Sequence, residues 1–330
     1  MLFFNTMILG TLISISSMSW LTAWIGLEIN LLSLMPLMKS HNNSNSAEAA
    51  MKYFIIQAMA SAMLLFSVII FTNSKTNSIE VSTISSILIS SAILLKLGAA
   101  PFHFWFPEVM SGMDWKMAYI LMTWQKIAPM ILLTYTTMVP MFLSVIIIFS
   151  SMISGLQGLN QTCLRKILAY SSINHVSWMI SALLVSTTTW MYYFITYCII
   201  NLNIILIFKK FNIFFISQLS KLFNFNKKLK FFFMLNFLSL GGLPPFLGFF
   251  PKWLTVNQMI FNKFYTLMMM LIIFTLIILY MYMRLTFSSF TMNTEESLTK
   301  MFKINSFIQF FINFSSLMSL IIVIVSTKFI

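Results

Sequence analysis

The chain has 330 residues, of which 59% are hydrophobic and only 8% are charged. A soluble domain carries roughly 25% charged residues, so this composition cannot cover a globular surface with polar groups. The apolar residues come in runs of about twenty, the length that spans a bilayer core, and we therefore expect an integral membrane protein.

The same composition argues against several functional classes. The net charge of +13 is not gathered on a soluble basic face, so nucleic acid is not an expected partner. The two cysteines, Cys163 and Cys198, and the three histidines lack the spacing of a disulfide framework, a zinc site or an iron–sulfur ligand set. No GxGxxG or P-loop motif occurs, so we expect no nucleotide and no cofactor on this chain. Leu2-Phe3-Phe4 directly after Met1 does not resemble a cleavable signal or an import leader, which predicts that the first helix is its own insertion signal.

The hydropathy pattern predicts an all-α polytopic membrane protein with eleven transmembrane helices. Their approximate ranges are 3–20, 22–38, 50–71, 81–111, 116–139, 141–160, 166–186, 189–208, 230–262, 264–284 and 306–327. The fourth and the ninth are too long for one crossing, and both contain glycines and prolines that interrupt a helix. Inside a bilayer, such a break is tolerated only where it is buried in protein or lines a wet cavity.

The basic residues predict the orientation of these helices. With eleven helices, fourteen of the twenty Lys and Arg residues fall on the side of the N-terminus. They are Lys39, Lys52, Lys116, Arg165, Lys166, Lys209, Lys210, Lys221, Lys227, Lys228, Lys230, Arg284, Lys300 and Lys303. Only Lys75, Lys263 and Lys328 fall on the other side, so the positive-inside rule places the N-terminus in the cytoplasm or its organellar equivalent.

The two interrupted helices share a motif. Five residues of the first recur 144 positions later in the second: Gly98, Pro101, Phe102, Phe106 and Pro107 become Gly242, Pro245, Phe246, Phe250 and Pro251. The two helices are five apart in the order, which reverses their direction. This predicts one membrane domain of two inverted five-helix repeats, residues 1–139 and 140–284, followed by a loop and a final helix in 285–330. Paired broken helices of this kind indicate an ion or substrate path in transporters; two Pro-kinked packing helices are the alternative.

Four charged residues lie well inside the predicted spans, away from their ends, where an ionised side chain costs roughly 2.5–3.5 kcal/mol. They are Glu28, Lys96, Lys126 and Lys252. A pair between Glu28 and Lys96 would favour the charged form of both, and its separation would let Lys96 release a proton. One glutamate and three lysines therefore predict a proton relay. A static buried ion pair is the alternative, and Lys252 could instead lie near the membrane interface.

Two histidines are further candidates for the relay. His103 lies in the first break, and His175 lies in an unusually polar span. Histidine titrates near neutral pH, which suits proton transfer, but a hydrogen-bonded packing histidine would have the same surroundings.

Six stretches together resemble subunit 2 of the NADH dehydrogenase of animal mitochondria. They are IGLEIN (25–30), LKLGAAPFHFWFPE (95–108), TWQKIAP (123–129), GLNQT (158–162), RKILAYSSI (165–173) and SLGGLPPFLGFFPKW (239–253). The similarity extends from the N-terminus to about residue 290 and is loose beyond it.

The resemblance implies a core, antiporter-like subunit of the membrane arm of respiratory complex I, in its shortened eleven-helix form. Glu28, Lys96, Lys126 and Lys252 would form the relay that contributes to proton translocation, coupled to electron transfer from NADH to ubiquinone. The chain would then be an enzyme only as a subunit of this complex. A stand-alone or Mrp-like cation/proton antiporter and a purely structural subunit are the alternatives.

The resemblance also predicts the surroundings of the chain. It would lie in the mitochondrial inner membrane with its N-terminus in the matrix. Its partners would be the other core and accessory subunits of the membrane arm and membrane lipid, with no nucleic acid and no direct contact with NADH. NADH, FMN, iron–sulfur clusters and ubiquinone are expected on other subunits.

Overall fold

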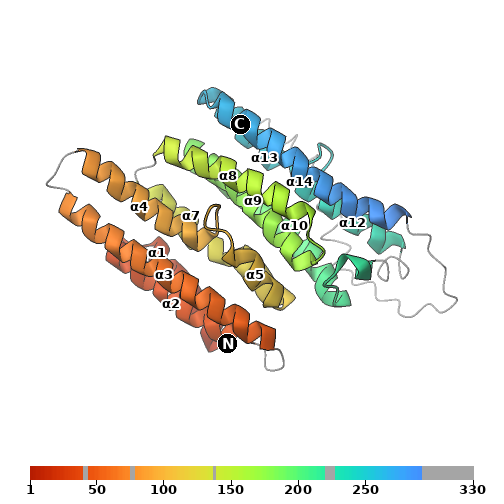
Figure 1. The fold of residues 1–330 in the computed structure, drawn as a ribbon, viewed down its shortest axis with the longest axis horizontal. Coiled ribbons are helices and arrows are strands. Elements are labelled where there is room, and N and C mark those ends of the chain that lie inside the picture. The colour runs from red at the N-terminus through yellow and green to blue at the C-terminus, as the bar shows by residue number, and fades with distance from the viewer. Residues whose placement is uncertain (40–43, 75–78, 137–138, 220–226, 292–330) are drawn as a thin grey trace. The chain divides into compact units, whose positions relative to one another are not determined.

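A computed structural model of the chain describes residues 1–39, 44–74, 79–136, 139–219 and 227–291 (Figure 1). Every regular element in this part of the chain is helical. The helices are α1 (Leu2–Ile15), α2 (Trp20–Met38), α3 (Ser44–Ser74), α4 (Ile79–Leu97), α5 (Trp105–Gly112), α6 (Trp115–Met122), α7 (Trp124–Tyr135), α8 (Pro140–Leu159), α9 (Leu164–Val185), α10 (Thr187–Phe211), the 3-10 turn η1 (Ile216–Gln218), α12 (Lys227–Gly241), α13 (Phe249–Phe261) and α14 (Tyr265–Thr291).

The all-helical membrane architecture predicted from composition is confirmed. Seven helical stretches in the described residues are long and apolar enough to cross a membrane. The first ten predicted spans each coincide with one helix or with two consecutive helices. The eleventh, 306–327, lies outside the described residues, so the count of eleven stays a prediction.

The chain forms two compact units, Met1–Ser150 and Ser151–Ile330. In the first unit α2 packs against α1 and α3, and α4 packs against α3 and α7 (Figure 1). In the second unit α9 contacts α10, α13 and α14. About 94% of the most apolar stretch of α9 is buried inside the protein, so this helix forms the centre of its unit.

The first predicted break separates α4 from α5. Gly98 follows α4 with a φ of +72°, a left-handed conformation that costs glycine little. Its N–H donates to the carbonyl of Leu95, and the N–H of Ala99 donates to the carbonyl of Leu94, both at 3.2 Å. This is the Schellman arrangement, which satisfies carbonyls that a helix end would otherwise leave unpaired.

The second predicted break, between α12 and α13, has the same backbone geometry. Gly242 has a φ of +77° and donates to Ser239, while Leu243 donates to Leu238. The next two turns also match at an offset of 144 residues: Phe102 to Ala99 and Phe106 to His103 in the first break, Phe246 to Leu243 and Phe250 to Leu247 in the second. The shared motif therefore produces the same helix end and the same two turns twice, although the peptide bond before Pro101 is cis and the described bond before Pro245 is not. The inversion of the two repeats concerns how the units face each other and stays a prediction.

A third interruption was not predicted. The predicted span 116–139 is divided at Thr123, between α6 and α7. Pro129 lies in α7 and has no N–H for the carbonyl four residues earlier, which weakens the helix on its N-terminal side. The Thr123 hydroxyl donates to the carbonyl of Tyr119 at 2.7 Å and satisfies one group at the end of α6. Pro129 was thus the feature of the sequence that could have predicted this interruption.

Candidate functional site

The first unit contains a small polar cavity among α2, α3, α4, α5, α6 and α7. Its volume of about 20 Å³ accommodates roughly one water molecule. Apolar side chains form most of its wall. The polar side chains on the wall are Asn30, Tyr53, Gln57, Lys96, Gln125 and Lys126. The structure therefore gathers two of the predicted lysines, which are 30 positions apart in the sequence, around one cavity.

Lys96 lies in the last turn of α4, directly before the first break, and only 8% of it is exposed. The carbonyls at a helix C-terminus favour a positive charge. Two side chains from other helices bind this end of α4: Gln57 donates to the carbonyl of Lys96 at 3.4 Å, and the indole of Trp105 donates to that of Leu95 at 3.2 Å. The break is thereby fixed to α3 and α5, and Lys96 is presented to the cavity.

Lys126 lies one turn after the interruption at Thr123, and only 2% of it is exposed. Its ammonium nitrogen is 5.7 Å from the centre of the Phe106 ring, within the range of a cation–π interaction. An aromatic face stabilises a cation without supplying a counter-charge. The surroundings of Lys126 therefore include a group that supports its charge without neutralising it.

A pair of side-chain amides connects α2 to α7 at the cavity. Asn30 donates to Gln125 at 2.8 Å, and Gln125 donates to Asn30 at 3.0 Å. This reciprocal pair fixes the helix that carries Glu28 to the helix that carries Lys126. This pair was not predicted from the sequence. The position of Asn30 two residues after Glu28, and of Gln125 next to Lys126, could have suggested it.

Glu28 lies on α2, two residues before Asn30. Its carboxylate interacts electrostatically with Lys96. Among the described residues, Glu28 and Lys96 form no ion pair closer than 4.0 Å, unlike Lys52, which pairs directly with Glu48 and Glu108. The Oε1 atom of Glu28 is buried and has no hydrogen-bond partner in the described part of the chain.

Lys252 belongs to the second unit and lies in the first turn of α13. Its ammonium donates to the carbonyl of Gly241 at 2.9 Å, so it joins the two halves of the second broken helix. It also lies 5.7 Å from the Trp178 ring. At an offset of 144 residues, Lys252 corresponds to Glu108 of the first unit.

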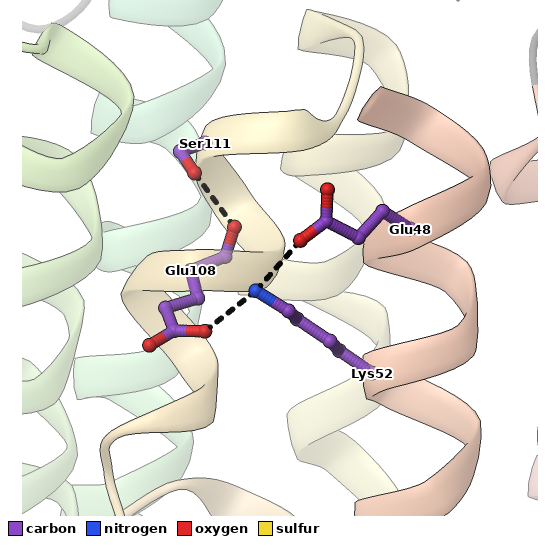
Figure 2. A network of polar contacts seen from close by, with 4 residues as sticks. All are labelled: Glu48, Lys52, Glu108 and Ser111. Atoms are coloured by element: carbon purple, nitrogen blue, oxygen red, sulfur yellow. Dashed lines mark hydrogen bonds and ion pairs between the residues drawn. The ribbon is translucent and has the colours of Figure 1, made fainter. Parts of the chain in front are cut away.

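Glu108 has very different surroundings, which Figure 2 shows. It is exposed and binds Lys52 of α3 at 2.9 Å, and Lys52 also binds Glu48 at 3.0 Å. The Ser111 hydroxyl donates to the carbonyl of Glu108 at 2.7 Å. The two local structures are thus alike in backbone but carry opposite charges at this position, one on the surface and one part-buried.

The two candidate histidines are both buried. The Nδ1 atom of His103 lies 3.3 Å from the Pro101 carbonyl within the first break, and His103 is not among the described side chains that line the cavity. His175 lies on α9, and its Nδ1 atom is 2.9 Å from the hydroxyl of Tyr193. Its ring also contacts Tyr197, with 5.0 Å between ring centres. His175 therefore joins a wider polar cluster in the second unit.

No group of three His, Cys, Asp or Glu side chains suited to a metal ion occurs in the described ranges. Each unit instead contains buried amines, amides and hydroxyls. The amines can accept and release protons, and the amides and hydroxyls can bind water, so the arrangement is chemically suited to proton transfer.

The chain is similar to known membrane proteins in both sequence and fold. The family model described as "NADH:quinone oxidoreductase/Mrp antiporter, TM" matches residues 17–279. The chain is 47% identical to the NADH-ubiquinone oxidoreductase chain 2 of Locusta migratoria over 309 residues, covering 93% of this chain and 90% of the relative. It is 46% identical to the chain of the same name from Anopheles gambiae, covering 90% and 87%.

The fold also resembles that of a chain in the respiratory complex I of Thermus thermophilus. The TM-score is 0.85 at 23% identity, covering 96% of this chain and 76% of that one. At this identity the likeness concerns the fold.

Proposed function

The chain belongs to the family of NADH:quinone oxidoreductase and Mrp antiporter membrane subunits, and we propose that it is a core membrane-arm subunit of NADH:ubiquinone oxidoreductase that takes part in proton translocation. Its relatives with 40–47% identity are named chain 2 of that enzyme. The enzyme activity belongs to the whole complex. NADH, FMN, iron–sulfur clusters and ubiquinone are then bound by other subunits, and the partners of this chain are neighbouring membrane-arm subunits and lipid.

One observation carries the proposal: Lys96 and Lys126 line the same buried cavity, and the nearby carboxylate of Glu28 is not in direct contact with Lys96. A lysine that serves only as half of a structural ion pair would contact its partner. A lysine at a cavity of water-molecule size can instead exchange a proton through that water. The separated Glu28 then acts as a switch, because its approach favours the protonated form of Lys96 and its withdrawal favours release.

Lys252 would extend the relay into the second unit. Its ammonium is bound to a helix-end carbonyl and faces an aromatic ring, an arrangement that stabilises charge without a counter-ion. Lys252 can therefore hold a proton within the second unit.

The finer topology is part of this proposal. We propose eleven helices in two inverted repeats, in the mitochondrial inner membrane, with the N-terminus in the matrix. Contacts between predicted same-side segments support it. Arg284 donates to the carbonyls of Leu159 and Gln161 at 2.6 and 3.1 Å, and Cys163 forms a β-bridge with Phe215.

An independent Mrp-like antiporter is the main alternative, since the family includes both kinds of protein. The high identity to the chain 2 relatives favours the subunit. A native gel of mild detergent extracts separates the two: the subunit migrates with NADH dehydrogenase activity in a band with other respiratory chains, whereas an independent carrier migrates alone.

The relay itself is tested by Lys96→Met in the assembled complex. We expect normal assembly on the native gel and a fall of about 10²-fold or more in proton pumping, because a proton-transfer group typically contributes roughly 10²–10⁴-fold. Protons moved per NADH oxidised are measured in proteoliposomes. Lys116→Met, at an exposed lysine of α6, is the matched control. Impaired assembly, with an unchanged proton-to-electron ratio in the complex that does assemble, would instead support a purely structural subunit.

A further inference from the structure

The centre of the second unit contains a second concentration of buried polar groups. On α9, Ser171, Ser172, Asn174 and His175 are all buried, although the helix is surrounded by α10, α13 and α14. The two serine hydroxyls donate to carbonyls one turn back in their own helix, both at 2.7 Å. Their oxygen lone pairs remain available as acceptors toward the neighbouring helices.

Three fully buried tyrosines from those neighbours face this stretch of α9. Tyr193 and Tyr197 lie one turn apart on α10, and Tyr282 lies on α14. The Tyr193 hydroxyl is 2.9 Å from His175, and Tyr197 interacts with the hydroxyl of Ser172. Each of these tyrosines thus brings an O–H, which can donate and accept at once, to a polar position of α9.

Tyr282 continues the cluster along α9. Its hydroxyl interacts with Ser171 but makes no hydrogen bond within the described residues. Tyr282 is two residues before Arg284, which binds the carbonyls at the end of α8. The cluster therefore extends from His175 to the end of the unit that carries Arg284, Arg165 and Lys166.

Lys252 lies at the other end of the cluster. Its ammonium faces the ring of Trp178, which is three residues after His175 and so one turn along α9. In order along α9, Lys252 faces Trp178, Tyr193 and Tyr197 face His175, Tyr197 also meets Ser172, and Tyr282 meets Ser171.

Several buried polar atoms of α9, α10 and α14 have no hydrogen-bond partner in the described part of the chain. They are Oδ1 of Asn174, Nδ2 of Asn201, both polar atoms of the Asn203 side chain and the hydroxyl of Tyr282. Leaving such atoms unpaired is costly, and ordered water is their usual partner. Their concentration on α9, α10 and α14 points to bound water along the series.

We propose that His175, Tyr193, Tyr197 and Tyr282, together with water, form a proton path between Lys252 and the basic end of the second unit. This rests on the proposed function, since it requires Lys252 to exchange protons. Each hydroxyl accepts a proton on one side of its oxygen while it gives its own proton to the next acceptor. The tyrosines therefore stay neutral, and the net result is the movement of one proton along the series.

The test is removal of single hydroxyls in the assembled complex. Tyr193→Phe and Tyr197→Phe keep the ring and delete the O–H. We expect assembly to be retained and proton pumping in proteoliposomes to fall by about tenfold. Tyr192→Phe is the matched control, because Tyr192 is the same residue type on the same helix but is exposed. Should Tyr193→Phe impair assembly, Tyr282→Phe tests the same path, since its hydroxyl makes no hydrogen bond in the described residues.

Lys252→Met, measured in parallel, distinguishes failure of this inference from failure of the proposed function. Reduced pumping with Lys252→Met but unchanged pumping with all three tyrosine variants would overturn the path and leave the function intact. Unchanged pumping with every variant would overturn both in this unit. Reduced pumping with the tyrosine variants alone would overturn the assignment of Lys252 as the start of the path.

Discussion

At the scale of single residues, the exposed and the buried lysines of the protein have different surroundings. The exposed Lys52 binds two glutamates directly, as Figure 2 shows. The buried Lys96 and Lys126 line one cavity, and Lys126 also faces the Phe106 ring. Exposed ion pairs contribute little stability, whereas placing an amine inside a membrane is costly. Buried charges in membrane-spanning segments are therefore usually functional.

The Asn30–Gln125 pair gives a residue-scale prediction. Asn30→Leu or Gln125→Leu leaves one buried amide unpaired, so each single variant lowers the thermal stability of the complex in detergent. The double variant removes both amides, so its loss of stability is smaller than the sum of the two single losses. The coupling energy is expected to be roughly 0.6–1.7 kcal/mol, the range for polar pairs between membrane helices. Strictly additive losses in the midpoint of thermal inactivation would contradict the pairing.

At the scale of elements, the two breaks place a lysine by different means. In the first unit Lys96 belongs to the last turn of the broken helix, whereas in the second unit Lys252 reaches back from α13 to the carbonyl of Gly241. Both depend on a glycine with positive φ, Gly98 or Gly242, directly after the helix end. The turn is therefore the part of the motif that both units require, and the charge is the part that differs.

Gly242→Ala tests this dependence. A Cβ at this position would lie 2.8 Å from Cδ of Lys252 and would require a left-handed alanine, which costs roughly 1–2 kcal/mol. We expect a lower midpoint of thermal inactivation together with reduced proton pumping, because Lys252 must move off the Gly241 carbonyl. Gly241→Ala is the control, since its Cβ would meet its nearest neighbour at an ordinary 3.5 Å. Equal effects of the two variants would show that the positive φ of Gly242 is unimportant.

At the scale of the whole molecule, the chain combines two compact units, each with a broken helix and a buried polar centre. Loops predicted to share one side of the membrane contact each other within the second unit. The segment around Cys163 and that around Phe215 form a β-bridge, and Leu164 donates to the Phe214 carbonyl at 2.9 Å. These contacts agree with the side assigned to the basic residues nearby.

The proposed orientation predicts the labelling of native cysteines. Cys163 is partly exposed in the connection between α8 and α9, and Cys198 lies within the apolar α10. A membrane-impermeant maleimide should modify Cys163 in inside-out vesicles and not in mitoplasts, as read by mass spectrometry. Cys198 should remain unmodified in both. Labelling of Cys163 from the outer face would reverse the proposed topology.

The sequence by itself determined the membrane class, the positions of the first ten helices and the two breaks, because length, hydropathy, glycine and proline act locally along the chain. It also identified Glu28, Lys96, Lys126 and Lys252, since any charge in an apolar span is conspicuous. Only the tertiary structure decided what surrounds them.

The amide pair joins residues 95 positions apart. The cavity requires several packed helices, and the separation of Glu28 from Lys96 depends on how those helices meet. Likewise, the tyrosines beside His175 look like ordinary apolar filler in the sequence. Only the tertiary structure shows that the hydroxyls on α10 and α14 contact α9. Contacts between helices depend on how the helices pack and not on the local sequence pattern.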